Sequence, residues 1–133
     1  MALDSEVVWN RAALGDAGVE RRSGDLALMA LLSVHSLAMN GGLLHSVEVL
    51  DPSELDDAAE GFRYFGLGGA AAALEWARAQ ALHVDVDADP ADAERIELEA
   101  NARYWAAVPD DAAVWDAFVS KFSESPKAFA PKT

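Results

Sequence analysis

The feature that most constrains the fold is the apolar stretch Leu26-Ala-Leu-Met-Ala-Leu-Leu-Ser-Val-His-Ser-Leu-Ala-Met39, which ends at Asn40-Gly41-Gly42. On an α-helix its large apolar residues fall on all sides, and a helix that is apolar all round must be surrounded by other parts of the protein. Its length of about 21 Å is too short to span a membrane. The stretch therefore predicts a buried central helix, about residues 25–39, in an all-α bundle.

The remaining helices are predicted from their start and stop signals. Asp51-Pro52-Ser53-Glu54 combines a capping carboxylate with a proline at the first helical position, and the glycines between 66 and 69 end that helix at a corner. Pro90 opens a long helix, and Pro109-Asp110-Asp111 starts the last one. Residues 43–50 fit a helix or a strand, and we choose a helix because no second strand is available to pair with it.

Together these signals predict a compact single-domain bundle of six or seven helices over residues 1–125. The segment 126–133 contains two prolines and two lysines and shows no helical periodicity, so we expect it to be a loosely held C-terminal tail.

Charge and cysteine content exclude several classes of function. The chain has 23 acidic and 10 basic residues, a net charge of −13, and no cysteine. Such a surface repels nucleic acid and anionic membranes, so a charge-steered partner should be basic. Disulfides, thiolate metal sites and cysteine nucleophiles are impossible. No secretory signal or membrane span is recognisable, which predicts a cytoplasmic protein.

The acidic residues concentrate in two regions. Ten lie between residues 85 and 116, where the only bases are Arg95 and Arg103, and five lie between residues 51 and 60 with no base. Helical spacing predicts ion pairs from Asp92 to Arg95 and from Glu99 to Arg103, which leaves eight unpaired acids in the first region. The predicted partner-binding surface comprises Asp51, Glu54, Asp56, Asp57, Asp85, Asp87, Asp89, Asp92, Glu94, Glu97 and Glu99.

Such a surface has two interpretations. Carboxylates on neighbouring helical turns lie about 5–6 Å apart, which is comparable with phosphate spacing along a DNA strand. The surface could therefore present a DNA-like array of charge to a protein. The alternative is that the acidity reflects the composition of the source proteome and serves only solubility.

The sequence shows no metal, cofactor or catalytic motif. Asp85, Asp87 and Asp89 alternate as in a calcium loop, but Pro90 stands where that loop needs glycine, and position twelve is Ile96 rather than glutamate. We therefore read the segment as a solvated acidic linker. The histidines lack zinc-binding spacing, and His35 is interpreted as a hydrogen-bonded core residue. These observations predict a protein that is not an enzyme and has no cofactor.

A family resemblance narrows the function. The stretch Met39-Asn-Gly-Gly-Leu-Leu-His-Ser, then Gly61-Phe-Arg-Tyr-Phe-Gly-Leu-Gly-Gly and an alanine-rich helix, and later Arg103-Tyr104-Trp105 and Ala128-Phe129, resembles a bacterial domain-of-unknown-function family that includes DNA-mimic proteins. The chain departs from that family's usual aromatic and glutamine after the glycine corner, where it has Leu43 and His45. The resemblance implies an all-helical, dimeric acidic protein that occupies the DNA-binding face of a transcription regulator.

Three functions follow in order of preference. The first is a non-enzymatic acidic protein-binding domain, a DNA mimic that covers the basic surface of a DNA-binding regulator. The second is a small-molecule-binding protein or enzyme with a site near His35, His45 and the Gly66–Gly69 corner. The third is an immunity-type or structural interaction protein whose contact is apolar and uses exposed tryptophans.

Overall fold

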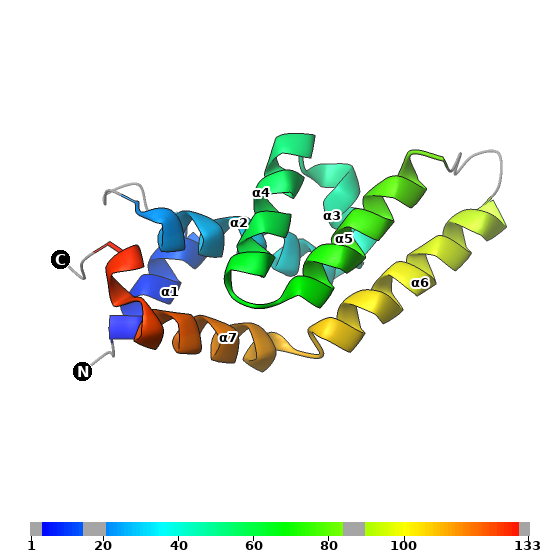
Figure 1. The fold of residues 1–133 in the computed structure, drawn as a ribbon. Helices are drawn as coiled ribbons and strands as arrows, with labels where there is room; N and C mark the ends of the chain where they lie inside the picture. Colours follow the sequence, from blue (N-terminus) through cyan, green and yellow to red (C-terminus); the bar gives the residue numbers. More distant parts are fainter. Residues whose placement is uncertain (1–3, 15–20, 84–89, 131–133) are drawn as a thin grey trace.

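The computed structural model describes residues 4–14, 21–83 and 90–130. These residues form seven α-helices and a 3₁₀ turn, with no strand among them (Figure 1). The elements are α1 (Asp4–Leu14), α2 (Ser23–Gly41), α3 (Leu43–Val49), α4 (Pro52–Tyr64), α5 (Gly68–Ala81), α6 (Pro90–Ala107), α7 (Asp111–Glu124) and the turn η1 (Pro126–Ala128). The predictions of an all-α fold with six or seven helices, and of a helix over residues 43–50, are confirmed.

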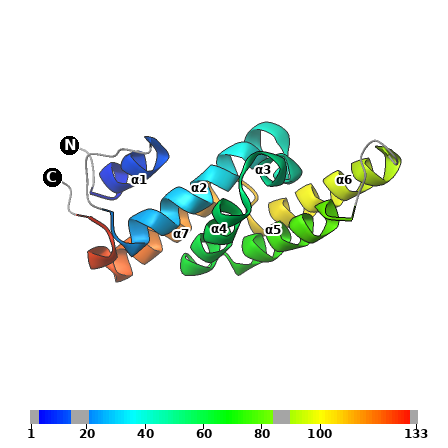
Figure 2. The same cartoon turned by 90° about the horizontal axis from the view of Figure 1, so that it is seen from above.

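Helix α2 is the central helix, as predicted. It packs against α1, α3, α4 and η1, and it buries Leu28, Leu31 and Val34 completely. Figure 2 shows it running from beside α1 to α3. Its enclosure is incomplete, however, because Leu26 is 56 % exposed and Met39 is 47 % exposed. These two side chains are therefore available on the surface near either end of the helix.

The helix starts and corners follow the local sequence. The Asp110 carboxylate accepts a hydrogen bond from the Ala113 amide at 3.0 Å and caps α7. At the start of α4, Glu54 accepts a hydrogen bond from the Asp51 amide at 3.1 Å. Gly42 has a φ of 89°, which a residue with a side chain rarely adopts, so the chain can turn directly from α2 into α3.

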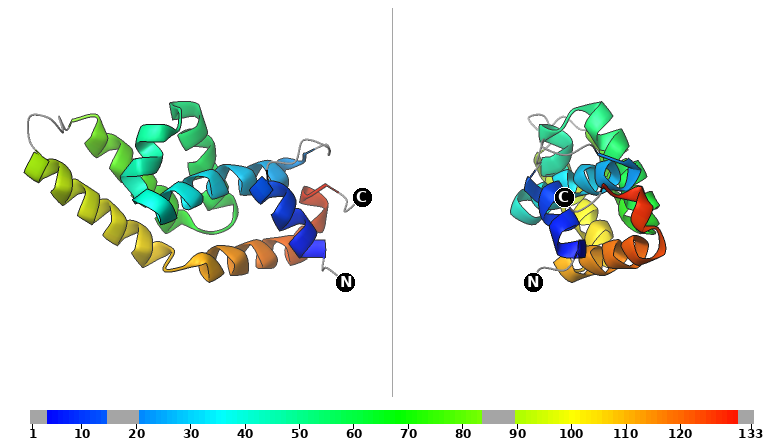
Figure 3. Two further views of the ribbon diagram at one scale, coloured as in Figure 1. Left: turned by 180° about the vertical axis from the view of Figure 1, so that it is seen from behind. Right: turned by 90° about the vertical axis from the view of Figure 1, so that its left-hand side faces the viewer.

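Helices α5 and α6 form an antiparallel pair that extends away from α1 (Figure 1). The chain bends at residues 108–110, and α7 continues beyond the end of α6 toward α1 (Figure 3). Trp115 on α7 packs edge-to-face against Trp9 on α1, with ring centroids 5.1 Å apart. The C-terminal helix thus reaches the N-terminal one. None of the described helices has both the length and the apolar character needed to cross a membrane.

The segment after α7 is packed rather than loosely held. Phe129 is 2 % exposed and Ala130 is 4 % exposed. The Phe129 ring lies 5.3 Å from that of Phe122 and 5.6 Å from that of Phe118, centroid to centroid. The expectation of a loose tail from residue 126 is therefore wrong for residues 126–130, because one aromatic side chain anchors the segment in the core. Residues 131–133 lie outside the described part of the chain.

Candidate partner-binding surface and the His35 pocket

The predicted acidic residues of α4 have different surroundings. Asp51, Glu54, Asp56 and Asp57 are all exposed. Asp56 receives a hydrogen bond from Arg78 on α5 at 2.5 Å, so its charge is partly neutralised. Asp51 and Glu54 take part in the cap of the helix, and neither they nor Asp57 forms an ion pair with a described residue.

On α6 the local pairing predicted from spacing is confirmed. Arg95 donates to Asp92 at 2.6 Å, and Arg103 donates to Glu99 at 3.0 Å. Glu94 and Glu97 are exposed and form no ion pair with any residue that the structure describes. The unneutralised charge of the described part of α6 thus lies on Glu94 and Glu97.

The two acidic helices are separated in the fold. Helix α5 packs against α4 on one side and α6 on the other, as Figure 1 shows. The structure therefore places the predicted surface on two helices that flank α5. Asp85, Asp87 and Asp89 belong to the same prediction but lie outside the described residues. Within residues 4–14, 21–83 and 90–130 no three His, Cys, Asp or Glu side chains are grouped to hold a metal ion.

His35 is buried in a hydrogen-bond network that joins three helices. Its Nδ1 lies 2.7 Å from the Tyr104 hydroxyl of α6, and its Nε2 lies 2.6 Å from Asp111 Oδ1 of α7. A neutral imidazole satisfies both contacts when the tyrosine donates to Nδ1 and the protonated Nε2 donates to the carboxylate. Both ring nitrogens are then occupied by hydrogen bonds within the protein. The prediction of a hydrogen-bonded core histidine is confirmed.

Tyr104 is completely buried at one end of this network. Burial, followed by the nearby negative charge of Asp111, raises the pKa of the Tyr104 hydroxyl well above the ordinary tyrosine value. The hydroxyl therefore keeps its proton over the whole physiological pH range.

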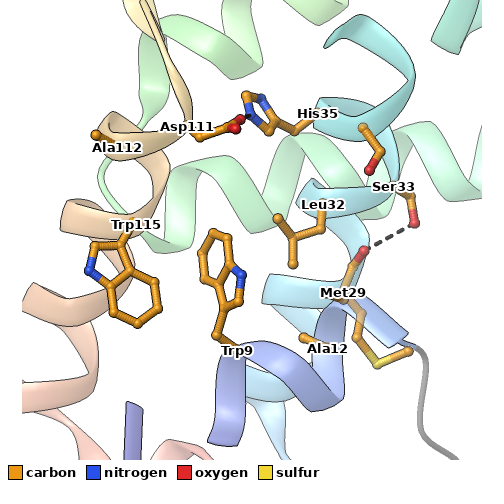
Figure 4. Close-up of a pocket in the computed structure, with 11 residues that line it drawn as sticks. Trp9, Ala12, Met29, Leu32, Ser33, His35, Asp111, Ala112 and Trp115 are labelled. Carbon is orange, nitrogen blue, oxygen red and sulfur yellow. Dashed lines mark hydrogen bonds and ion pairs between the residues drawn. The ribbon is translucent and has the colours of Figure 1, made fainter. Parts of the chain in front are cut away.

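A pocket of about 580 Å³ lies beside His35, between α1, α2 and α7 (Figure 4). Trp9 and Trp115 stand next to each other on one side, Met29 and Leu32 contribute apolar surface from α2, and Asp111 meets His35 at the edge. Apolar walls with a few polar groups are typical of small-molecule sites. His45 and the Gly66–Gly69 corner, which sequence reasoning grouped with His35, do not line this pocket.

His45 and the glycine corner lie elsewhere in the fold. The His45 ring packs against Gly41 at the turn between α2 and α3, where an added Cβ on Gly41 would come within 2.8 Å of it. Gly66, with a φ of 77°, allows the chain to pass from α4 into α5, which confirms the interpretation of this segment as a helix–helix corner.

Sequence reasoning missed a buried ionic network around Asp25. This carboxylate is 4 % exposed and accepts hydrogen bonds from Arg11 at 3.2 Å, from the Arg22 amide at 3.0 Å and from the Ala130 amide at 2.7 Å. Arg11 also donates to the Ala130 carbonyl at 2.9 Å. The only available signal was the position of Asp25 in the first turn of a helix, which indicated a cap and gave no hint of the distant partners.

Comparison with known proteins gives one match. Neither the curated proteins nor the solved structures contain a match to this chain. Among protein families, residues 22–131 match the family described as DMP19-like protein. The matched range begins immediately before α2 and ends one residue after Ala130. It therefore includes both acidic helices, the His35 network and both partners of the Asp25–Ala130 contact. The chain therefore belongs to the DMP19-like protein family.

Proposed function

We propose that this protein is a non-enzymatic DNA mimic that binds the basic DNA-binding surface of a transcription regulator. Membership of the DMP19-like family suggests a DNA-mimic protein. The observation that carries the proposal is that exposed carboxylates on α4 and α6, namely Asp57, Glu60, Glu94 and Glu97, form no ion pair with a described residue. These charges are available to a basic partner.

Physical arguments support this binding mode. With a net charge of −13, the protein attracts basic surfaces over distances of about a Debye length, and the attraction weakens as salt is added. Asp92 and Glu99 contribute less because each already faces an arginine of its own helix.

The experiment is capture of partners from the cytosol of the source organism, followed by a competition assay. Immobilised protein should retain a DNA-binding protein at low salt and release it at high salt. Added in solution, it should displace that protein from its DNA. The variant Glu94→Lys with Glu97→Lys should weaken both effects by about tenfold, because it reverses unpaired charges in the contact.

The matched control carries the same change in charge on α7. Asp116 and Glu124 are exposed and form no ion pair with a described residue, so Asp116→Lys with Glu124→Lys should leave displacement nearly unchanged. Capture that is insensitive to salt, or equal loss in both double variants, would contradict the proposal. The homodimer that the family resemblance implies remains a prediction, which light scattering on the purified protein would check.

A second function rests on the His35 pocket, whose apolar walls and volume of about 580 Å³ suit a small ligand. A small-molecule-binding role predicts that a ligand raises the melting temperature and that Trp115→Ala abolishes this effect. The immunity-type alternative, which needs exposed tryptophans, is less well supported because Trp9, Trp76, Trp105 and Trp115 are all half-buried.

A further inference from the structure

Helix α4 has two sides that differ in charge. On the side that faces α5, Asp56 pairs with Arg78, and Arg63 pairs with Glu75. Both signs of charge are therefore matched across the seam between α4 and α5.

On the side that faces α2, the carboxylates of α4 are unmatched. Glu54, Asp57 and Glu60 are exposed, follow one another at intervals of three residues, and form no ion pair with a described residue. Helix α2 cannot supply a cation, because its only charged residue is Asp25, which is buried. The three carboxylates extend over about 9 Å of helix and form a continuous negative edge.

Along this edge the surface is hollowed. A depression of about 430 Å³ is lined by Leu26, Ala27 and Ala30 of α2 and by Asp57, Glu60 and Gly61 of α4. A second, of about 170 Å³, adjoins it and shares Ala30 and Asp57. Together these two depressions are called the α2–α4 groove. Figure 2 shows α2 and α4 lying beside each other where the groove runs.

The bottom of the groove is apolar because α2 and α4 approach closely. A Cβ added to Gly61 would overlap the Ala27 carbonyl oxygen, so only glycine allows this separation of the helices. Leu26 is 56 % exposed above the small side chains of Ala27 and Ala30. Tyr64 also lines the larger depression, and the Lys121 ammonium group lies 4.7 Å from its ring centroid.

We propose that the α2–α4 groove binds an amphipathic basic segment of a partner protein. One face of that segment packs apolar side chains against Leu26 and Ala30, and its flanking lysines or arginines lie opposite Glu54, Asp57 and Glu60. A purely polar cationic segment would leave the apolar bottom of the groove exposed to water, whereas an apolar one would leave the carboxylates unmatched. A second copy of this chain fits less well, since both copies carry a net charge of −13.

This inference rests on the proposed function and deepens it. It assigns part of the contact with the regulator to the α2–α4 groove. It also adds an apolar contact, which mimicry of DNA by charge alone does not provide. In helix-in-groove recognition, the bound helix places apolar side chains at helical spacing into the groove. The inference therefore predicts the shape of the partner's contact as well as its charge.

The test uses a synthetic, fluorescently labelled peptide of lysine, leucine and alanine whose leucines fall on one helical face. A second peptide of the same composition distributes the leucines around the helix. Binding is followed by fluorescence anisotropy at low ionic strength. The first peptide should bind at least about tenfold more tightly than the second, because only the first can fill the groove and meet the carboxylates together.

Two variants locate the site. Asp57→Asn with Glu60→Gln should weaken binding of the first peptide by about tenfold, and Leu26→Ser should weaken it by a similar factor. The matched control Glu94→Gln with Glu97→Gln removes the same charge from α6 and should change binding by less than about twofold. Circular dichroism melts establish that each variant is folded. Because the Leu26 variant and the Asp57–Glu60 double variant are separate, the test remains possible if one of them does not fold.

Several results would overturn the inference. They are equal binding of the two peptides, equal loss in the α4 and α6 double variants, and a wild-type dimer that Leu26→Ser dissociates, since the last would mean that a second copy covers the groove. The proposed function fails separately. If the peptide binds in the groove as expected but the captured regulator is not displaced from DNA, the groove is supported as a binding site and the DNA-mimic function is contradicted.

Discussion

The Ala130 amide donates a hydrogen bond of 2.7 Å to the Asp25 carboxylate, which joins positions 105 residues apart in the chain. Arg11 contacts both partners, through Asp25 Oδ1 and the Ala130 carbonyl. One buried carboxylate therefore holds together α1, the start of α2 and the segment after α7. Since the contact is almost fully removed from water, its loss should be costly.

We predict that Asp25→Ala lowers the free energy of unfolding by about 3–5 kcal/mol, because it removes the carboxylate that faces the buried Arg11 guanidinium and leaves the Ala130 amide without its acceptor. Urea unfolding followed by circular dichroism measures the change. Asp116→Ala, on the exposed face of α7, serves as the control and should stay within about 0.5 kcal/mol of the wild type. Similar losses in the two variants would show that the Asp25 network contributes little.

Tyr104→Phe should lower the free energy of unfolding by about 1–3 kcal/mol, because it leaves His35 Nδ1 buried without a hydrogen-bond partner. Tyr64→Phe is the matched control, since Tyr64 is half-buried and its hydroxyl forms no hydrogen bond with a described residue. The two unfolding curves, measured near neutral pH, give the comparison. A larger loss in the Tyr64 variant would contradict the role given to the His35 network.

The same tyrosine predicts a loss of stability in alkali. Burial and the charge of Asp111 raise the pKa of Tyr104 in the folded protein, so above the ordinary tyrosine pKa of about 10 the unfolded chain releases a proton that the folded protein keeps. The contribution is fully present below that pH and is lost as the pH rises above it. In an alkaline titration, one phenolate absorbance step should coincide with unfolding and should be missing in Tyr104→Phe.

Gly61→Ala should destabilise the protein by about 1–3 kcal/mol, because the new methyl group would overlap the Ala27 carbonyl oxygen and push α4 away from α2. Gly68→Ala provides the comparison, since a Cβ there meets nothing within 4 Å and alanine favours the helix. Thermal and urea unfolding of the two variants should move in opposite directions. Equal effects would mean that the close approach of α2 and α4 is not required.

Phe129→Ala should cost about 3–5 kcal/mol, which is the usual range for removing a fully buried phenylalanine. The neighbouring Lys127 is exposed, so Lys127→Ala should have almost no effect on the urea midpoint. Protease digestion offers a second measurement, because release of the anchored segment should speed cleavage after α7. Unchanged stability in the Phe129 variant would restore the interpretation of residues 126–130 as a loose tail.

Local features were predictable from the sequence because their causes lie within a few residues. The α4 start at Asp51-Pro52 and the Asp92–Arg95 and Glu99–Arg103 pairs all depend on spacing along a single helix. The core helix was recognisable from its apolar residues, although periodicity could not show that Leu26 would remain exposed at a groove.

Features that depend on how helices meet were not predictable. Asp56 and Arg78 are 22 residues apart, and their pairing exists only because α4 and α5 pack side by side. His35 was expected to be hydrogen-bonded, but its partners Tyr104 and Asp111 come from the far end of the chain. Phe129 was missed for a different reason, since a single apolar residue among prolines and lysines creates no periodic pattern.

The position of Ala130 on Asp25 also has a consequence for biosynthesis. The Asp25 carboxylate is synthesised 105 residues before the Ala130 amide that donates a hydrogen bond to it. Until residue 130 has been translated, the Asp25 carboxylate lacks one of its three hydrogen-bond donors. The contact between the start of α2 and the segment after α7 can therefore form only after helices α2 to α7 have been synthesised.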